Sequence, residues 1–478
     1  MPRPKHYLFL LPLALTLFLV TSELVERSMY TDGVAYAGIS DNLANGVGSL
    51  WNPRLSDVHN TAFFGHPPLV FGLQSLVFRV FGSSLVSERV YAGTIFLLSA
   101  LLLVLLWREV LRDYPPGRKL WFLPLTLWLA NEVVYHFYPA NVLEPTTGLF
   151  TLLAVYAGVR TLQPGTATGR QLVGAVLLGF FVFLGTLCKG FVALFPLALY
   201  GLYFLVHGQP KLRKAALLTG VACLALGLGY LLLWQYAPAR SLLQRYFEGQ
   251  VLASVSGELT AHHFRDNRFY IIRRTVEVLL PAVGITLLLV GVGWRHLKGA
   301  PGTGPQLRAA WLLLGLGAAA SLPLAISPKQ SFYYLLPSMA YFAAGLACLC
   351  VPVVASYFER ATRPWERWGI PVLMVGLLMA GAYNTARHWG AITRRDRVVL
   401  SDIDAMATVV PVRATVGSVG DIGELVSYFY RHHYVSIDTA VGAVPDYEFV
   451  IINEVAEVPA GFELLELGTE RYRLARRE

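Results

Sequence analysis

The chain alternates long apolar runs with short polar connections, the pattern of a protein that crosses a membrane many times. A transmembrane helix needs about 20 apolar residues, with some tolerance. Eleven runs meet this requirement, at about 7–22, 86–107, 120–138, 141–161, 171–187, 190–207, 214–236, 271–294, 307–326, 331–354 and 368–384. The pattern therefore predicts a polytopic α-helical membrane protein with about 11 transmembrane helices.

One apolar segment is too short for a span and decides the topology. Residues 67–81 begin with two prolines and end near Arg79, so we expect a helix that lies in the membrane interface. If this segment does not cross, six segments lie on the same side of the membrane as the N-terminus. They are 1–6, 108–119, 160–170, 207–214, 295–308 and 359–367, and each contains Lys or Arg. Basic short loops face the cytoplasm. The turns at Lys189 and Lys329, the 31–85 loop and the C-terminus are then expected outside.

The composition changes after residue 393. Residues 414–420 and 447–453 read as strands, 423–435 as a helix between them, and the last two apolar stretches as a hairpin. We therefore divide the chain into a transmembrane domain, 1–393, and a small extracytoplasmic α/β domain, 394–478.

Composition supports the membrane assignment and removes other classes. Of 478 residues, 55% are hydrophobic and only 14% are charged, against about 25% in soluble domains. The net charge of +9 is that of basic cytoplasmic loops, so no nucleic-acid partner is expected. The four cysteines lie in or beside apolar segments and predict neither disulfides nor a metal site.

The stretch from Thr31 to Leu69 contains several ionisable residues between apolar segments. Asp32 lies soon after the first span, and His66 lies near the end of the stretch. Ionisable groups at the membrane boundary are costly and indicate a functional site. The alternative is a solvated connection whose charges only face water.

Two motifs in this stretch resemble the PMT-like branch of the GT-C glycosyltransferases, which includes aminoarabinose transferases. Asp32 and Tyr36 match the family's D-E-x-x-Y pattern, with Gly33 in place of the second acid. His66-Pro67-Pro68-Leu69 matches its H-K-P-P-L motif without the lysine. The resemblance implies a GT-C-like fold, with interfacial helices in the first outer loop.

Three later segments extend the resemblance. Glu144 precedes Pro145 where the family has an acid followed by proline, and Lys189 precedes a glycine as in the family's T-K-G-P. Lys329, Tyr333 and Tyr334 match a basic-x-x-x-Y-Y-L-L-P turn. Without the resemblance, Glu144 could equally be a helix N-terminal acid favoured by the helix dipole, and the lysines could extend to the interface.

The resemblance implies transfer of a sugar from a polyprenyl-phosphate donor to a lipid, glycan or protein acceptor, outside the bacterial inner membrane. Asp32 would be the general base and Glu144 would position a substrate. Tyr36, His66, Lys189, Lys329, Tyr333 and Tyr334 would bind substrate. The resemblance also implies inversion at the anomeric carbon, without cofactor or metal.

Other interpretations remain open at this point. A transporter or flippase for a lipid-linked or polar solute would also have many spans and buried charges, and so would a membrane scaffold with an outer sensor domain. The cation-rich loop at 237–270 is compatible with covering the site, contacting an acceptor or binding lipid. Its His262 and His263 fit no standard metal spacing.

Overall fold

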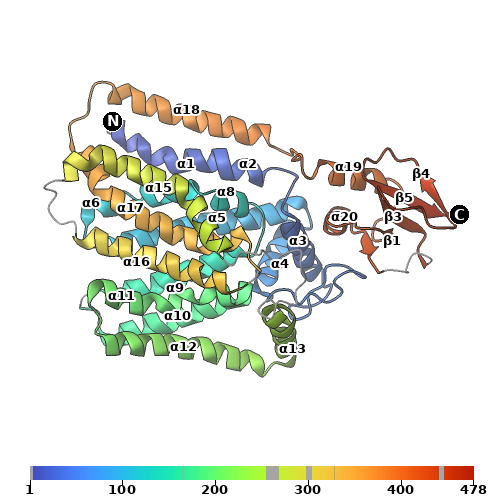
Figure 1. Cartoon of the computed structure of the whole chain (residues 1–478), viewed down its shortest axis with the longest axis horizontal. Coiled ribbons are helices and arrows are strands. Elements are labelled where there is room, and N and C mark those ends of the chain that lie inside the picture. Colours follow the sequence, from blue (N-terminus) through green and yellow to red (C-terminus); the bar gives the residue numbers. More distant parts are fainter. Residues whose placement is uncertain (1–3, 164, 254–268, 298–303, 328, 441–445) are drawn as a thin grey trace. The chain divides into compact units, whose positions relative to one another are not determined.

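The computed structural model describes residues 4–163, 165–253, 269–297, 304–327, 329–440 and 446–478 (Figure 1). Contacts divide the chain into two compact units. Unit 1 comprises residues 1–23, 93–139 and 143–387, and unit 2 comprises residues 24–92, 140–142 and 388–478. The predicted domain boundary at residue 394 stays a prediction, but residues 24–92 group with the C-terminal region by contact.

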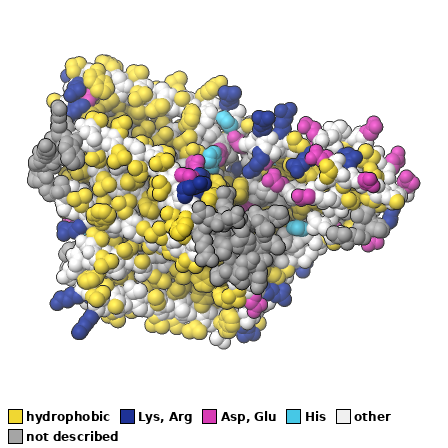
Figure 2. Space-filling view, viewed as in Figure 1, with side chains coloured by type: hydrophobic (Ala, Val, Ile, Leu, Met, Phe, Trp, Pro, Cys, Tyr) yellow, Lys and Arg dark blue, Asp and Glu magenta, His cyan; other side chains and the backbone are white. Residues whose placement is uncertain are grey.

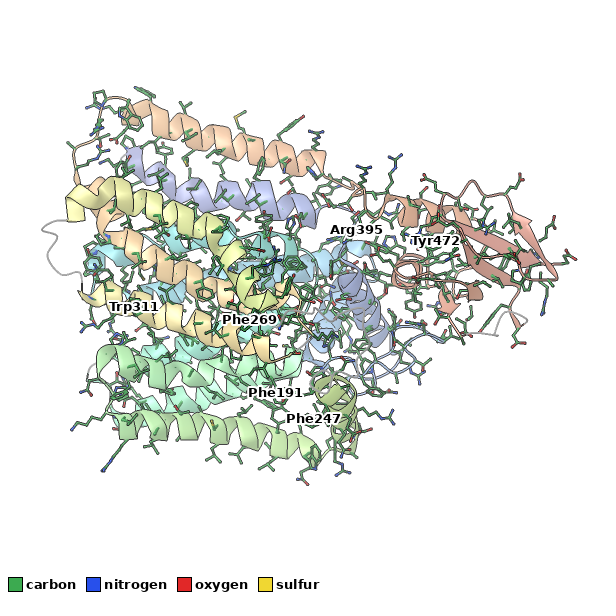
Figure 3. The ribbon with its side chains drawn as sticks, in the orientation of Figure 1. Phe191, Phe247, Phe269, Trp311, Arg395 and Tyr472 are labelled. Atoms are coloured by element: carbon green, nitrogen blue, oxygen red, sulfur yellow. The ribbon has the colours of Figure 1, made fainter. Side chains whose placement is uncertain are left out.

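Unit 1 is a bundle of long helices whose outer faces are apolar. Within the described residues, eight helices are long and apolar enough to cross a membrane: Pro4–Leu24, Leu85–Val110 (α5, which begins in unit 2), Thr168–His207, Leu212–Trp234 (α12), Tyr270–Gly293, Gly304–Ile326, Phe332–Glu359 and Glu366–Arg387 (α18). Hydrophobic side chains cover the visible face of these helices (Figure 2). Trp311, for example, is 66% exposed (Figure 3). The multi-pass membrane prediction is therefore confirmed.

The eight candidates account for most of the eleven predicted spans. The run Thr168–His207 has 40 residues, about twice what one crossing needs, and contains two of the predicted spans. It consists of α10 (Thr168–Lys189), the 3₁₀ helix η3 (Gly190–Ala198) and α11 (Leu199–His207). Helix α9 (Glu144–Thr161) is a further predicted span with 18 residues. The number eleven itself stays a prediction.

The predicted span at 120–138 is wrong as a single helix. The structure has two short helices there, α7 (Phe122–Leu129) and α8 (Glu132–Phe137). The Asn131 side chain donates to the carbonyls of Leu127 and Trp128 at 2.7 and 3.2 Å. A side-chain amide thus satisfies carbonyls at the end of α7, so the break is tolerated inside an apolar region.

The centre of unit 1 is the run Phe332–Glu359, formed by η6 (Phe332–Leu335) and α17 (Leu336–Glu359). It is the most buried of the eight candidates and contacts α7, α9, α15 (Tyr270–Leu297) and α16 (Gly304–Ser321). Many of its buried residues are small, among them Gly345, Ala347 and Cys348, so neighbouring helices approach closely. Helix η5 (Leu322–Ile326) follows α16.

The basic connections meet at one end of unit 1. A cavity of about 830 Å³ is lined by residues between Glu109 and Asp113, Val159 and Gln171, Tyr203 and Lys214, and Pro305 and Leu312. A second cavity of about 480 Å³ joins residues 5–9, 115–120 and 355–362. The single connection 108–119 contributes to both, so described residues of all six predicted cytoplasmic segments lie at this end. Which side of the membrane they face stays a prediction. Short helix α6 (Pro115–Arg118) lies in that connection.

Unit 2 contains a five-stranded sheet of order β2-β1-β3-β5-β4. Its strands are β1 (Thr415–Val419), β2 (Ser436–Asp438), β3 (Phe449–Asn453), β4 (Phe462–Leu465) and β5 (Tyr472–Arg477). β1 pairs in parallel with β2 and β3, whereas β5 pairs antiparallel with β3 and β4. The predicted strands, the helix α20 (Leu425–His433) and the final hairpin are confirmed. Strand β2 and helix α19 (Arg397–Met406) were not predicted.

The rest of unit 2 packs on this α/β core. Met29 and Val34 share a hydrophobic cluster with α19, α20 and the sheet. Val34 lies on α3 (Thr31–Ala44), and the segment predicted to be interfacial forms α4 (Leu69–Phe81). Helix α4 has 13 residues, which is about 20 Å of helix and too short to cross a bilayer core of about 30 Å.

Candidate functional site

In unit 1, Glu144 and Lys189 form a buried ion pair. Glu144 is fully buried in the first turn of α9, and Lys189 is 8% exposed in the last turn of α10. The Lys189 ammonium donates to Glu144 Oε1. A helix N-terminus favours an anion and a helix C-terminus favours a cation, so both charges are also stabilised by their own helices. The alternative in which the Lys189 side chain only extends to the interface is wrong, because the ammonium is buried against Glu144.

The residue after Lys189 explains the local turn. Gly190 has φ +71°, a left-handed conformation that favours glycine, and its N–H donates to the Thr186 carbonyl at the end of α10. A Cβ atom at Gly190 would lie 2.2 Å from the hydroxyl oxygen of Tyr246. Glycine at position 190 is therefore favoured both by the turn and by the close approach of Tyr246.

Two tyrosines complete the surroundings of the Lys189 ammonium. Lys189 Nζ lies 4.3 Å from the ring centroid of Tyr334 and 5.1 Å from that of Tyr333, both in η6. These cation–π contacts stabilise a desolvated ammonium by about 2 kcal/mol or more. The structure thus brings together four of the predicted site residues, Glu144, Lys189, Tyr333 and Tyr334. Lys329 lies before η6 and is half-buried.

This cluster lies at the end of the bundle opposite the basic connections. Glu144 begins α9 and Thr161 ends it beside the cavity of about 830 Å³, so about 27 Å of helix separates the two ends. Aromatic side chains are exposed near Lys189. Phe191 and Phe247 are 56% and 43% exposed, with ring centroids 6.4 Å apart (Figure 3).

Part of the 237–270 loop is described. It forms α13 (Ala237–Tyr246) and the π-helix η4 (Phe247–Leu252). Tyr246, at the end of α13, supplies the hydroxyl group that approaches Gly190. Residues 254–268, with His262 and His263, lie outside the described residues.

In unit 2, the two predicted motifs lie side by side. Asp32 is in the first turn of α3 and Tyr36 follows one turn later, so they share a face of the helix. The Tyr36 ring meets the His66 ring edge to face, with centroids 5.8 Å apart, and also packs against Phe63 and Phe71. The D-x-x-x-Y and H-P-P-L motifs are therefore parts of one structural feature.

A buried hydrogen-bond chain holds the backbone next to Asp32. Asn141 Nδ2 donates to the Gly33 carbonyl at 3.0 Å, and Gln74 Nε2 donates to Asn141 Oδ1 at 2.7 Å. Ser40 Oγ lies 2.8 Å from Gln74 Oε1. Asn141 has φ +57°, a conformation that asparagine adopts more readily than most residues. Sequence reasoning missed this hydrogen-bond chain, although an asparagine at the start of a predicted apolar span is a weak signal for it.

The packing of Gly33 explains why the family's second acid is absent. A Cβ atom at Gly33 would lie 1.9 Å from the Ala140 carbonyl oxygen, a backbone atom that a small shift cannot remove. Any side chain at this position would have to displace the segment that carries Asn141. Glycine is thus required by this backbone, and Asp32 is the one acid of the motif.

The carboxylate of Asp41, the next acid on α3, is buried and held by hydrogen bonds. It is 1% exposed and accepts hydrogen bonds from Tyr434 at 2.6 Å and Ser83 at 2.5 Å. Arg431 Nη1 lies 3.6 Å from Asp41 Oδ2, and Arg431 Nη2 lies 2.7 Å from Glu88 Oε2. All three side chains are buried. Asp41 therefore links α3 to α20 and is a poor candidate for a base.

Comparison with known proteins finds a family similar to part of the chain. The family described as Dolichyl-phosphate-mannose-protein mannosyltransferase matches residues 65–234, which contain His66, Glu144 and Lys189. An undecaprenyl phosphate-alpha-4-amino-4-deoxy-L-arabinose arabinosyl transferase of Proteus mirabilis is 29% identical over 234 residues, 47% of this chain. Over these residues the chain is similar to the PMT-like glycosyltransferases. It covers 39% of the length of the Proteus relative.

Solved structures give the fold. The crystal structure of ArnT from Cupriavidus metallidurans bound to undecaprenyl phosphate matches 98% of this chain and 97% of its own, with a TM-score of 0.64 and 13% identity. The crystal structure of the same protein in the apo state matches with a TM-score of 0.65 and 14% identity. The oligosaccharyltransferase of Archaeoglobus fulgidus in the apo form matches with a TM-score of 0.52 and 10% identity. The match covers 94% of this chain and 69% of that protein's chain. The predicted GT-C-like fold is confirmed.

Proposed function

We propose that the protein transfers a sugar from a polyprenyl-phosphate donor to a lipid, glycan or protein acceptor on the outer side of the bacterial cytoplasmic membrane. The observation that carries this proposal is the Glu144–Lys189–Tyr333–Tyr334 cluster, at the end of the bundle opposite the basic connections. The family match includes Glu144 and Lys189. A related fold binds undecaprenyl phosphate, which supports the same class of carrier here. The relatives give no support to transport.

The chemistry assigns a role to each side chain. Transfer breaks the bond between the anomeric carbon and the phosphate oxygen, and the phosphate leaves with its charge. Cations stabilise this leaving group without protonating it. Lys189 and Lys329 would supply that charge, and a ring N–H of His66 would donate to a phosphate oxygen. Aromatic rings such as Tyr36, Tyr333 and Tyr334 would contact the sugar or the carrier.

The acceptor must lose a proton as its oxygen or nitrogen attacks the anomeric carbon. A carboxylate within hydrogen-bond reach serves as the general base. Asp32 is assigned this role because it occupies the family's acidic position and is held by the Asn141 hydrogen bond to the next residue. Attack opposite the leaving phosphate would invert the anomeric centre.

The Glu144–Lys189 pair would prepare the cation before the donor arrives. The carboxylate offsets the cost of burying Lys189 and holds its ammonium over the rings of Tyr333 and Tyr334. A donor phosphate would add a second anion to the same ammonium. Glu144 thus positions Lys189 and is not itself the base.

The test is a transfer assay with the purified full chain. Undecaprenyl-phosphate sugars, including 4-amino-4-deoxy-L-arabinose, would be incubated with lipid, glycan and peptide acceptors. Asp32→Asn should reduce turnover by about 10²–10⁴-fold while leaving donor binding unchanged, since it keeps size and hydrogen bonding but removes basicity. Asp57→Asn, which changes an exposed acid of the same segment, is the matched control.

Two results would contradict the proposal. Absence of transfer from every polyprenyl-phosphate sugar would remove the assigned activity. Near-normal transfer by Asp32→Asn, with a confirmed donor and acceptor, would remove Asp32 from the mechanism and leave the activity standing.

A further inference from the structure

The larger cavity at the basic end of unit 1 lies away from the residues proposed for sugar transfer. The cavity of about 830 Å³ lies at the basic end of unit 1, about 27 Å of helix away from Glu144. The ends of α5, α9 and α11 and the starts of α10, α12 and α16 surround it. The transfer chemistry uses none of its lining residues, so the cavity needs a separate explanation.

The cavity collects positive charge. Four basic side chains line it, Lys211, Arg213, Lys214 and Arg308, against two acidic ones, Glu109 and Asp113. Glu109 accepts a hydrogen bond from Gln163 at 2.9 Å and lies 3.8 Å from Arg112. Within the described part of the chain, none of the four cations has a salt-bridge partner. Their excess charge is available to an anion.

A buried polar atom also faces the cavity. Gln171, in the first turns of α10, lines it and is 7% exposed. Its Oε1 has no hydrogen-bond partner within the described residues. An unsatisfied buried acceptor costs about 1–3 kcal/mol, so a ligand that donates a hydrogen bond here would gain affinity. A hydroxyl group is such a donor.

Apolar side chains also contribute to the lining, and exposed apolar residues lie beside the cations in the sequence. Val159, Leu162 and Leu312 line the cavity beside the charged residues. Exposed apolar side chains flank the cations in the sequence: Leu212 lies between Lys211 and Arg213, while Leu307 and Trp311 lie on either side of Arg308. A ligand held by these cations would therefore meet polar and apolar surfaces together, as an amphipathic molecule requires.

We propose that this cavity binds the headgroup of an anionic phospholipid, with its phosphate on Lys211, Arg213, Lys214 and Arg308 and a headgroup hydroxyl on Gln171. Basic pockets between transmembrane helices on the cytoplasmic side hold such headgroups. The acyl chains would extend along the exposed apolar residues of α12 and α16. A free phosphate ester has the same charge but would make no use of this apolar surface.

Native mass spectrometry of the full chain in detergent tests the proposal. The probes are phosphatidylglycerol, phosphatidylcholine and free glycerol phosphate. Phosphatidylglycerol should bind with a stoichiometry of one and more tightly than the other two. Each basic side chain near a membrane surface contributes about 1 kcal/mol, or about fivefold, so Arg213→Ala/Arg308→Ala should weaken binding about 25-fold. Gln171→Leu should weaken it about fivefold.

The control removes the same charge from the same end of the bundle. Arg118 and Arg170 are exposed, basic and outside the cavity lining, so Arg118→Ala/Arg170→Ala should leave phosphatidylglycerol binding unchanged. Equal weakening by this control would mean general surface attraction and would overturn the proposal. Binding unchanged by the cavity variants would also overturn it. Equal affinity for glycerol phosphate would identify a soluble phosphate ester and overturn the lipid assignment.

Discussion

The Glu144–Lys189 pair permits a double-mutant cycle that separates stability from chemistry. Lys189→Met leaves the fully buried Glu144 carboxylate without its cation. Breaking a buried pair in this way costs about 3–5 kcal/mol. Glu144→Met leaves the Lys189 ammonium, which still has the rings of Tyr333 and Tyr334 at 5.1 and 4.3 Å. Its cost should therefore be smaller, about 1–3 kcal/mol.

The double variant should recover stability. Methionine resembles both side chains in length and fills irregular space, and replacing a buried ion pair with apolar residues is often neutral. Lys189→Met/Glu144→Met should therefore be more stable than Lys189→Met alone, with a coupling energy of about 2–3 kcal/mol between the sites. It should nevertheless be inactive, because the proposed phosphate cation is lost.

The assay is equilibrium unfolding in mixed micelles, followed by tryptophan fluorescence, beside the transfer assay. Lys119→Met is the matched control because Lys119 is exposed, and its effect should stay within about 0.5 kcal/mol. A cost below about 1 kcal/mol for Lys189→Met, or additive single effects, would refute the buried-pair reasoning. Transfer at the normal rate by the stable double variant would refute the phosphate role instead.

Three further predictions test other parts of the chain. Gly33→Ala places Cβ 1.9 Å from the Ala140 carbonyl oxygen, so it should destabilise the protein by about 2 kcal/mol or more and reduce transfer, whereas Gly201→Ala, with open space around it, should do neither. Burial and the charge of Arg27 lower the pKa of His432 from 6.5 to about 3. The unfolded chain then binds a proton that the folded chain does not, so stability in a pH titration should fall below about pH 6.5, and His432→Phe should remove that part of the fall. A reporter that is active only in the cytoplasm should be silent when fused after Glu478, and activity there would contradict the predicted topology.

The order of apolar and polar residues within short stretches of sequence predicted most of the helices and strands. Apolar runs located the spans because a lipid-facing helix must be apolar over its whole length, whatever it packs against. The short helix at 67–81 followed from its length, and the strands of the C-terminal domain followed from short runs rich in valine and isoleucine. Asn131 shows where the pattern fails, since one polar side chain inside the apolar run at 120–138 accompanies a break between two helices.

The candidate site was predicted as a set of residues but not as an arrangement. The motifs supplied Glu144, Lys189, Tyr333 and Tyr334 separately, and only the fold placed the ammonium between the carboxylate and the rings. No spacing in the sequence relates residues 45 and 144 positions apart. Whether a lysine near the end of an apolar run is buried or exposed depends on what packs against it.

The sequence by itself determined that this is a multi-pass membrane protein with a small α/β region near its C-terminus, because hydropathy and strand propensity act over a few residues. Its motifs also indicated the resemblance to PMT-like glycosyltransferases, and a family model matches residues 65–234. Only the tertiary structure decided that residues 24–92 pack with the C-terminal region, that Asp41 is held by Arg431, and that Gly33 excludes a second acid. These features depend on contacts between residues more than a hundred positions apart, and such contacts form only when the whole chain has folded.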